Sequence, residues 1–467
     1  MTDTKQTDSG DVSTVNTSPG LQEDWTYKAE APMLPAKYLN SFWSPAMANH
    51  RKDYLKVMLP LVTMIIIMMW IVLPTYWGSL GEPISHVPNL TGYLVNYDGD
   101  GALGQAMIQA FENNTAGVGV PTNAHLTWYI VDPSTMPTEQ DVIHHVLEEK
   151  VWSAVVVHAS ATQTLVNARD NGDNTYNASL SITHYYNQAR NENAANGYIV
   201  PYTAALLQRS LAKFNAEFTG QYLSSVGSNA TAIATIAQAP VTVSQPFGFI
   251  AYNLRPFTKP VSTALLLVGN IYITIFSFIV TIAHDGARRM IHPYLRYRSY
   301  IGLRLVAPML LYIPVSFSYA MISLPFHATF GDKYGYAGGF FLFWIFVYLG
   351  MASLGLAIEA MITILTPRFT PFFLLILVIF NVSVGTLPFE LQPGFYKWGY
   401  GFPIYNLSIA TRTILFDTKN HLARNAGVLI GWIVLSFITI ALFTWMTRRE
   451  EVRRHEGQAD PEPAKHA

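Results

Sequence analysis

Long runs of apolar residues divide the chain and predict helices that cross a membrane. The first run, residues 57–76, contains no charged side chain, and at ~1.5 Å per residue its helix would span the roughly 30 Å of a bilayer's hydrocarbon core. It lies far from the first residue and is longer than the apolar core of a cleaved signal peptide, so we interpret it as a retained signal anchor. Five more runs follow toward the C-terminal end, at 261–283, 305–324, 340–365, 371–387 and 426–446.

A polar segment, residues 77–258, separates the first apolar run from the others. Stretches rich in Val, Ile, Tyr and Trp predict three strands in it, at 93–98, 126–132 and 152–159. Thr138 and Asp141 have the spacing of a capping box at a helix start, and Pro201 favours the start of another helix. The fold class is therefore an α-helical polytopic membrane protein with six transmembrane helices, one plus five, and an inserted α+β extracytoplasmic domain.

The expected domain boundaries follow from these patterns. The N-terminal segment is rich in Thr, Ser, Asp and Gly and has little hydrophobic periodicity, which is typical of disorder. The predicted parts are a disordered cytoplasmic tail at 1–56, a helix at 57–76, the extracytoplasmic domain at 77–258, a five-helix transmembrane domain at 261–446 and a cytoplasmic tail at 447–467.

Composition agrees with a membrane protein and excludes several other classes. Only 13% of the residues are charged, against roughly 25% in ordinary soluble proteins. The formal net charge is -1, so nucleic acid is not an expected partner, and the lipid bilayer is. The chain has no cysteine, which excludes disulfides, thiolate metal sites and cysteine nucleophiles.

Basic residues flank the predicted helices unevenly and suggest an orientation. They are concentrated before the first run, between 288 and 304 and after 447, which places both termini in the cytoplasm. The loop between the last two runs also carries basic residues and weakens this assignment. In the segments expected outside the cytoplasm, five asparagines match the N-glycosylation pattern: Asn89, Asn113, Asn177, Asn229 and Asn406.

A glycine motif raises the question of nucleotide binding. Gly99, Gly101 and Gly104 form a GxGxxG between a predicted strand and a predicted helix, which is the context of a dinucleotide fingerprint. Ala124 and His125 stand where that fingerprint would need an acidic residue. We therefore favour a tight turn that opens a helix.

Other patterns of catalytic or metal-binding chemistry are weak. His144, His145, Glu148 and Glu149 place two His–Glu pairs four residues apart on one predicted helix; this spacing can hold a metal, but solvated helix faces produce it often. The sequence has no P-loop, no GxSxG and no HExxH. We expect neither catalytic residues, nor a metal, nor a cofactor, nor enzyme activity, and any ATP-driven process would need a separate subunit.

Glu359, in the fourth apolar run at 340–365, is the most informative residue of the membrane region. A charged side chain inside a bilayer costs roughly 3 kcal/mol or more, so it usually faces a cavity or a partner and often carries function. Glu359 is a candidate intramembrane functional residue. The alternatives are that it pairs with Arg368, reaches the interface, or is protonated and packed.

Four further polar residues, two within the predicted helices and two directly after one, are candidates. Asn270 and Asn381 lie in the middle of apolar runs, where interhelical hydrogen bonding is their expected role. His284 and Asp285 follow the second run and form an interfacial titratable pair. A role at the helix end is favoured for this pair over proton transfer.

An aromatic segment lies between residues 388 and 406. Its Tyr396, Trp398, Tyr400 and Phe402 stand among prolines and glycines. They suit an aromatic belt at the outer membrane interface, which is the favoured interpretation. The alternative is an entrance where these four side chains contact an amphipathic ligand.

Several of these residues also carry a family resemblance. Glu359, the Asn-Val-Ser at 381–383, the run FYKWGYGFPIYN at 395–406 and the run NAGVLIGW at 425–432 resemble the fungal nitrosoguanidine-resistance membrane protein family. Asp98-Gly99, Phe416-Asp417-Thr418 and the run WSAVVV at 152–157 continue the likeness. It covers about residues 50–447 and excludes both tails.

The resemblance implies a plasma-membrane protein linked to tolerance of toxic compounds, with a helix plan similar to ABC-2-type permeases. It transfers no catalytic residue. The expected function is export, or export-assisting permease activity, on amphipathic small molecules or lipids, with a homodimer or a separate ATPase as partner. The alternative is a non-transporting membrane organiser that affects lipid asymmetry or the trafficking of other transporters. A third idea is an outward-facing sensor.

Overall fold

The computed structural model describes residues 39–118 and 125–459. The chain divides into two compact units, 1–66 and 67–467. The described part of the first unit contains the short turn η1 (Pro45–Met47) and the beginning of helix α1 (Ala48–Ser79). All elements discussed below lie in the second unit, which also contains the end of α1.

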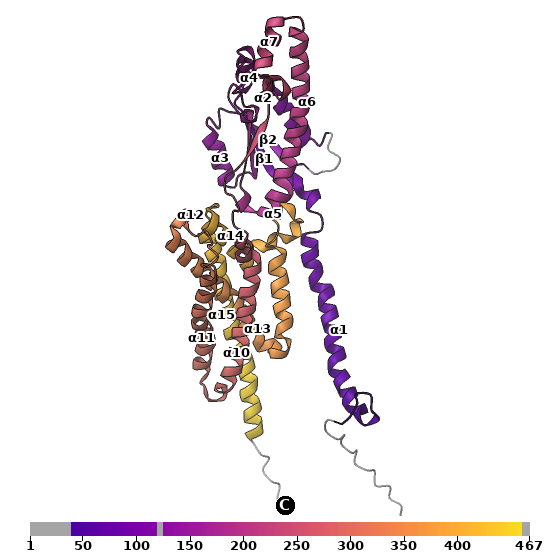
Figure 1. Ribbon diagram of the computed structural model, residues 1–467. Helices are drawn as coiled ribbons and strands as arrows, with labels where there is room; N and C mark the ends of the chain where they lie inside the picture. Colours follow the sequence, from indigo (N-terminus) through magenta and orange to yellow (C-terminus); the bar gives the residue numbers. More distant parts are fainter. Residues whose placement is uncertain (1–38, 119–124, 460–467) are drawn as a thin grey trace, which may run out of the picture. The chain divides into compact units, whose positions relative to one another are not determined.

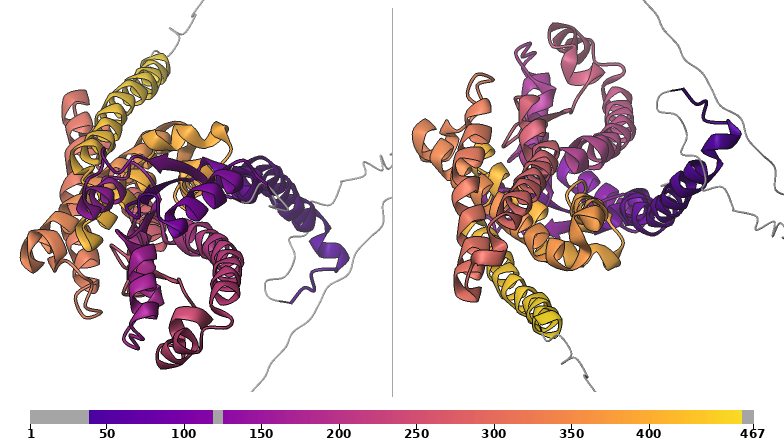
Figure 2. Two further views of the ribbon diagram at one scale, coloured as in Figure 1. Left: turned by 90° about the horizontal axis from the view of Figure 1, so that it is seen from above. Right: turned by 90° about the horizontal axis from the view of Figure 1, so that it is seen from below.

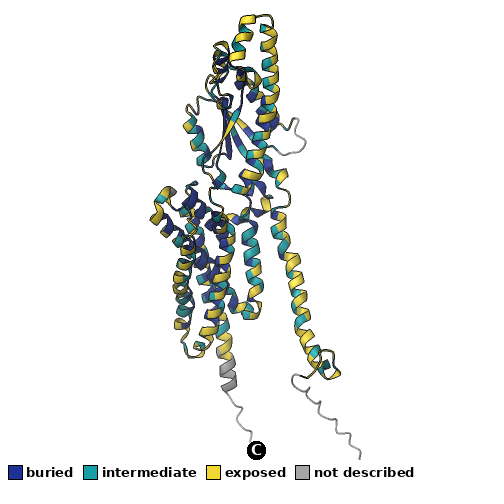
Figure 3. Ribbon diagram, in the orientation of Figure 1, coloured by how far each residue is buried: buried dark blue, intermediate teal, exposed yellow. Residues whose placement is uncertain are grey.

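Five described helical segments are long and apolar enough to cross a membrane: Pro45–Ser79, Val261–Arg289, Tyr297–Ile322, Tyr336–Ser383 and Leu422–Glu451. Large apolar side chains of these helices are exposed, among them Trp70 at 79% and Ile438 at 60%, and Figure 3 shows α1 mostly exposed along its length. Exposed apolar surface of this extent requires an apolar surrounding such as lipid. A multi-pass membrane protein is therefore confirmed.

The C-terminal helices form one bundle, labelled in Figure 1 and seen from its two ends in Figure 2. The central helix α13 contacts all the others, because its small and apolar residues allow close packing on every side. Its neighbours are α10 (Gly269–Arg289), α11 (Tyr297–Ile322) and α15 (Leu422–Ala459), and α10 continues from the short turns α9 (Val261–Thr263) and η6 (Ala264–Val268).

Helix α13 (Tyr336–Ser383) contains both of the runs predicted as separate helices at 340–365 and 371–387. Its backbone leaves the helical conformation at Thr366, which has φ 61° and ψ 160°. Pro367 follows directly, and a proline disfavours the helical conformation in the residue before it. The break therefore falls where the two apolar runs meet, and five long helical segments account for six predicted runs.

The short helix α14 (Pro403–Phe416) was missed by the sequence analysis, which expected a loop there. Twelve of its 14 residues are buried, and it packs against α13 and α15. Pro403 occupies its first position, where a missing backbone N–H costs nothing. Asn381 of α13 accepts a hydrogen bond from the Ile404 N–H at 3.0 Å, which fixes this helix start to the bundle.

A five-stranded mixed sheet forms the core of the polar segment, in the order β2-β1-β3-β4-β5. β1 is parallel to β2 and β3, β4 is antiparallel to β3, and β5 is parallel to β4. The three predicted strands are confirmed as β1–β3, and the last two were not foreseen. The strands are β1 (Thr91–Asn96), β2 (Thr127–Val131), β3 (Ser153–Val157), β4 (Ile182–Tyr186) and β5 (Phe249–Asn253).

Helices cover both faces of this sheet, so all five residues of β3 are buried. One face packs against α2 (Ala102–Thr115), α4 (Ala161–Asp170) and α6 (Val200–Val226). The other face packs against α3 (Glu139–Leu147), whose predicted capping box of Thr138 and Asp141 is confirmed. The remaining described α-helices of this domain are α5 (Glu192–Ala194), α7 (Ala230–Gln238) and α8 (Val241–Ser244).

Candidate functional site

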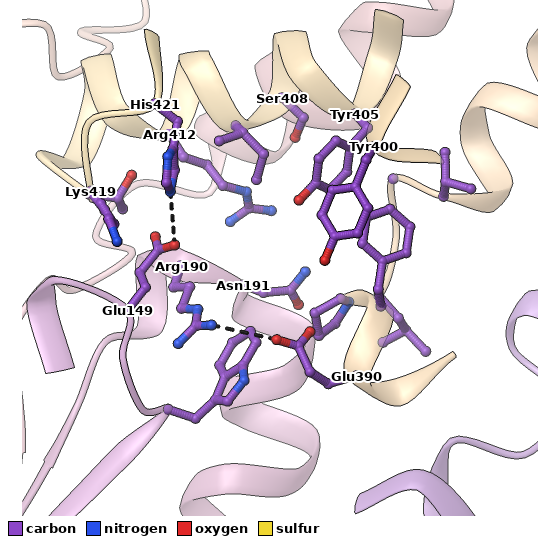
Figure 4. Close-up of a pocket in the computed structure, with 18 of the residues that line it drawn as sticks. Glu149, Arg190, Asn191, Glu390, Tyr400, Tyr405, Ser408, Arg412, Lys419 and His421 are labelled. Atoms are coloured by element: carbon purple, nitrogen blue, oxygen red, sulfur yellow. Dashed lines mark hydrogen bonds and ion pairs between the residues drawn. The ribbon is translucent and has the colours of Figure 1, made fainter. Parts of the chain in front are cut away.

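A cavity of about 240 Å³ lies where the mixed-sheet domain meets the end of the helix bundle. Figure 4 shows its polar lining. The sheet domain contributes the turn after α3, with Glu149, and the turn η4 (Gln188–Arg190). The bundle contributes α14, the segment between α14 and α15, and the turns η8 (Phe389–Leu391) and η9 (Gly394–Gly401).

Two ion pairs cross the cavity and join these parts. His421 Nε2 lies 3.3 Å from Glu149 Oε2, and Arg190 lies 3.6 Å from Glu390. Burial alone would raise the pKa of Glu149, but the hydrogen bond from His421 and the nearby charge of Arg190 hold that pKa below its usual range. The Arg190 guanidinium also lies 3.4 Å above the Trp152 ring, a cation–π contact that fixes its orientation.

Arg412 reaches the cavity from α14 and is only 4% exposed. It donates to the Ala189 carbonyl at 2.9 Å and pairs with Glu192 at 2.5 Å. Burial raises the pKa of Glu192, and the adjacent Arg412 more than offsets this, so the pKa lies below its ordinary value. Lys419, after α14, donates to the Glu148 carbonyl at 2.8 Å. Charged contacts therefore fix the sheet domain to the bundle.

Aromatic rings form the opposite wall of the cavity. The Phe389 ring centroid lies 4.2 Å from that of Tyr400 and 4.8 Å from that of Tyr405. The hydroxyls of both tyrosines and of Ser408 point toward the open centre (Figure 4). A cavity with cationic and hydroxyl donors on one side and aromatic rings on the other has the chemistry to hold an amphipathic molecule.

Of the four aromatic residues proposed as ligand contacts, Tyr400 lines this cavity. Tyr396 is buried and donates its hydroxyl hydrogen to the Thr75 carbonyl of α1 at 2.8 Å. Trp398 packs on Phe402 with ring centroids 4.5 Å apart. Tyr396, Trp398 and Phe402 are therefore in packing contacts and not among the residues that line the cavity. The structure also brings Tyr405 to the site, which the sequence analysis did not single out.

Glu359 belongs to a separate, fully buried charge cluster between the bundle helices. Arg304 of α11 donates to its carboxylate at 2.9 Å and to its backbone carbonyl at 2.7 Å. Arg288 of α10 donates to the same carboxylate oxygen and to Asp285 at 2.6 Å. Two guanidinium groups offset the cost of burying this charge. Of the alternatives considered, a partner is present, but it is this arginine pair and not Arg368.

His284 lies beside this cluster, with Nδ1 3.7 Å from the second oxygen of Glu359. Both of its ring nitrogens are buried and have no hydrogen-bond partner among the described residues. Asp285 accepts from Arg288 and Arg289 in the last turn of α10. His284 and Asp285 therefore do not act as a pair: His284 faces Glu359, and Asp285 binds the two arginines of its own helix end.

The two mid-helix amides have different surroundings. Asn270 donates to the Leu266 carbonyl of the preceding turn at 2.5 Å. Asn381 donates to Leu377 and, through its oxygen, also accepts from the start of α14. Only Asn381 makes the interhelical hydrogen bond expected of both.

The five glycosylation sequons differ in exposure. Asn89, Asn113, Asn177 and Asn229 are exposed. Asn406 is completely buried in α14, and its amide nitrogen donates to the Tyr400 and Phe402 carbonyls. A glycan has no room at Asn406 in this conformation, because the loop expected there is a buried helix.

The glycine motif forms the turn between β1 and α2, with Gly99 at φ +61°. The Asp98 carboxylate accepts hydrogen bonds from the Thr162 backbone N–H at 3.0 Å and hydroxyl at 2.6 Å, and from Gly104 at 3.4 Å. A carboxylate thus stands where a dinucleotide's phosphate would approach, as expected for a tight turn. No group of three potential metal ligands occurs among residues 39–118 and 125–459.

The sequence is similar to known proteins over most of its length. Residues 61–438 match the family described as "Protein of unknown function (DUF3533)". The uncharacterized endoplasmic reticulum membrane protein YJR015W of Saccharomyces cerevisiae is 22% identical over 425 residues, which cover 85% of this chain and 81% of that protein. No solved structure matches the chain.

Proposed function

This chain belongs to the DUF3533 family of membrane proteins, and we propose that it assists the export of amphipathic small molecules or lipids and so confers resistance to toxic compounds. The cavity between the sheet domain and the bundle supports this proposal. It joins donors such as Arg412 to an aromatic wall at the end of the membrane helices. An amphipathic molecule that leaves a bilayer needs polar contacts for its headgroup and apolar contacts for its tail, and this cavity offers both.

The proposal includes an arrangement in the membrane. The break at Thr366 lets α13 cross twice, so the chain crosses six times, with both termini in the cytoplasm and the sheet domain outside. The protein acts at the plasma membrane, in line with the resemblance to the nitrosoguanidine-resistance family and to ABC-2-type permeases. The sequence has no P-loop, so an ion gradient or a separate ATPase supplies the energy, and a homodimer is the expected assembly.

The buried cluster around Glu359 favours a second candidate, a non-transporting organiser of the membrane. A proton-coupled exporter needs an acid that gains and loses a proton during the cycle. Glu359 is 0% exposed and paired with Arg288 and Arg304. These two arginines hold its carboxylate in one position and compensate its negative charge. Such a cluster suits a rigid scaffold that affects lipid asymmetry or the trafficking of other transporters.

An efflux measurement separates the two candidates. Saccharomyces cerevisiae cells lacking their own relative are loaded with a fluorescent amphipathic toxicant, with and without this protein and with and without a protonophore. Faster efflux with the protein supports export, and loss of that gain with the protonophore assigns the energy to an ion gradient. Resistance with unchanged efflux contradicts export and supports the organiser. Equal sensitivity with and without the protein contradicts both.

A further inference from the structure

The polar groups that remain free in the cavity are of one kind. Glu149 and Glu390, the two carboxylates that line it, are already paired with His421 and Arg190. The hydroxyls of Tyr400, Tyr405 and Ser408 have no hydrogen-bond partner among the described residues, although they point to the centre. These three hydroxyls can donate hydrogen bonds to a ligand, and both carboxylates of the lining already face cations.

The cations of the lining add to this preference. Arg190, Arg412, Lys419 and Arg424 line the cavity. Arg190 and Arg412 are fixed by acidic partners and by the backbone carbonyls of Val151 and Ala189, and Glu148 lies 3.9 Å from Lys419. Arg424, at the start of α15, is exposed and has no ion pair within the described part of the chain. It adds a positive charge that no carboxylate compensates.

The apolar part of the lining sits beside these donors. Phe389 is 6% exposed and contacts the rings of both cavity tyrosines. Val384 and Leu387, which follow α13, continue this wall toward the bundle. A hydrocarbon or aromatic tail can be buried here, at about 25 cal/mol per Å² of apolar surface, while its headgroup faces the donors.

We propose that this cavity binds anionic amphiphiles, with a phosphate or carboxylate headgroup at Tyr405, Ser408 and Arg424 and an apolar tail along Phe389. Cationic amphiphiles are disfavoured, because the carboxylates of the lining already face His421 and Arg190 and a cation would meet the positive charge of Arg424. The physiological meaning of this preference rests on the proposed export function, but the binding itself does not. A lipid headgroup and free phosphate share the headgroup chemistry, and the tail distinguishes them.

Binding to the purified full-length protein tests this inference. The protein is kept in an uncharged maltoside detergent, and bound molecules are counted by native mass spectrometry with dodecyl phosphate, dodecyltrimethylammonium and inorganic phosphate as separate probes. We expect one dodecyl phosphate per chain, with at least about tenfold weaker binding of the other two. Equal binding of the cationic probe overturns the charge preference, and equal binding of inorganic phosphate overturns the apolar part of the site.

Two conservative variants locate the site. Tyr405→Phe removes only a hydroxyl, and we expect dodecyl phosphate to bind about tenfold more weakly, as for a lost hydrogen bond to a charged group. Arg424→Gln should weaken binding about threefold, since exposed charges contribute less. Tyr252→Phe removes a hydroxyl and Lys397→Gln removes a positive charge at exposed positions outside the cavity, and both should leave binding unchanged. Unchanged binding in both cavity variants overturns the assignment.

The outcome is separable from that of the efflux measurement. Efflux without binding of dodecyl phosphate refutes the anionic ligand class and leaves export intact. Selective binding with unchanged efflux refutes export and leaves the ligand class in place. Thermal unfolding of each variant in detergent shows whether it is folded, and Tyr405→Phe keeps the ring that packs on Phe389.

Discussion

Glu149 and His421 are 272 residues apart in the sequence, and yet Glu149 Oε2 and His421 Nε2 lie 3.3 Å from each other. One belongs to the turn after α3 in the sheet domain and the other to the segment between α14 and α15. Together with Arg412–Glu192, this pair ties the two parts at the wall of the cavity. The cavity's shape therefore depends on charged contacts between distant segments.

The Glu149–His421 pair should make stability depend on pH. The folded-state pKa of Glu149 is lowered, so its contribution is present above the ordinary value of about 4.3 and is lost as the pH falls through the lowered folded value. We expect the thermal stability of the wild type to fall more steeply below about pH 5 than that of Glu149→Gln, with a difference at neutral pH of about 1 kcal/mol.

Unfolding curves in detergent between about pH 3 and pH 7 would check this expectation. These limits lie roughly one unit or more on either side of the ordinary pKa of a glutamate carboxyl. Glu112→Gln removes an exposed carboxylate of α2 for which no such pairing exists in the described structure, and its pH profile should match that of the wild type. Parallel profiles for Glu149→Gln and the wild type would show that the pair adds nothing to stability.

The charge cluster in the bundle should be structural. Glu359→Gln leaves Arg304 buried without a compensating charge and leaves Arg288 with Asp285 alone, and breaking such a buried pair costs about 3 kcal/mol or more. We expect a large loss of folded protein and of thermal stability. The double variant Glu359→Gln with Arg304→Gln should lose less than the sum of the single changes, because the two residues are in direct contact. A Glu359→Gln protein as stable as the wild type but without efflux would instead identify Glu359 as a proton carrier.

Close helix packing depends on Gly355 of α13. A Cβ atom there would lie 2.1 Å from the Tyr312 hydroxyl of α11 and 3.0 Å from Ser277 of α10. Gly355→Ala should therefore destabilise the bundle by about 1–3 kcal/mol, measured as a lower unfolding temperature. Gly302→Ala, at an α11 position where nothing lies within 4 Å of the added atom, is the matched control and should not be destabilised; equal effects of both changes would rule out the packing explanation.

Glycosylation tests the orientation of the sheet domain. If that domain faces the lumen or the outside, the exposed sequons Asn89, Asn113, Asn177 and Asn229 can receive glycans, whereas buried Asn406 cannot. We expect an endoglycosidase to increase the electrophoretic mobility of the wild type. Asn→Gln changes at the exposed sites should remove this shift stepwise, and Asn406→Gln should not alter it. A protein without any shift would count against the proposed orientation.

The apolar runs could be predicted from sequence because a bilayer-spanning helix needs about 20 consecutive apolar residues. Helix α14 has Asn406, Ser408 and Arg412 within its 14 residues, so it lacks such a run, and only the packed bundle accounts for its burial. Strand β4 contains the polar residues Thr183 and His184, which interrupt the apolar pattern by which a buried strand is recognised in a sequence. His184 is accommodated because it shares a 2.7 Å hydrogen bond with Ser153.

The candidate site was only partly predictable, because contacts between segments far apart in the sequence leave no local pattern. The aromatic segment and Tyr400 were visible as a cluster in sequence, but Tyr405, Arg412 and His421 acquire their role from segments far away. The same holds for Glu359, whose partners Arg288 and Arg304 are 71 and 55 residues distant on other helices. Spacing within one helix carries no signal for contacts of this kind.

The most direct test of the central claim compares efflux of a fluorescent anionic amphiphile from cells that carry wild type, Tyr405→Phe or Tyr252→Phe at equal surface amounts. If the cavity handles the exported molecule, Tyr405→Phe should slow efflux by up to about tenfold, and Tyr252→Phe should match the wild type. Equal efflux by all three proteins would contradict a role for the cavity in export.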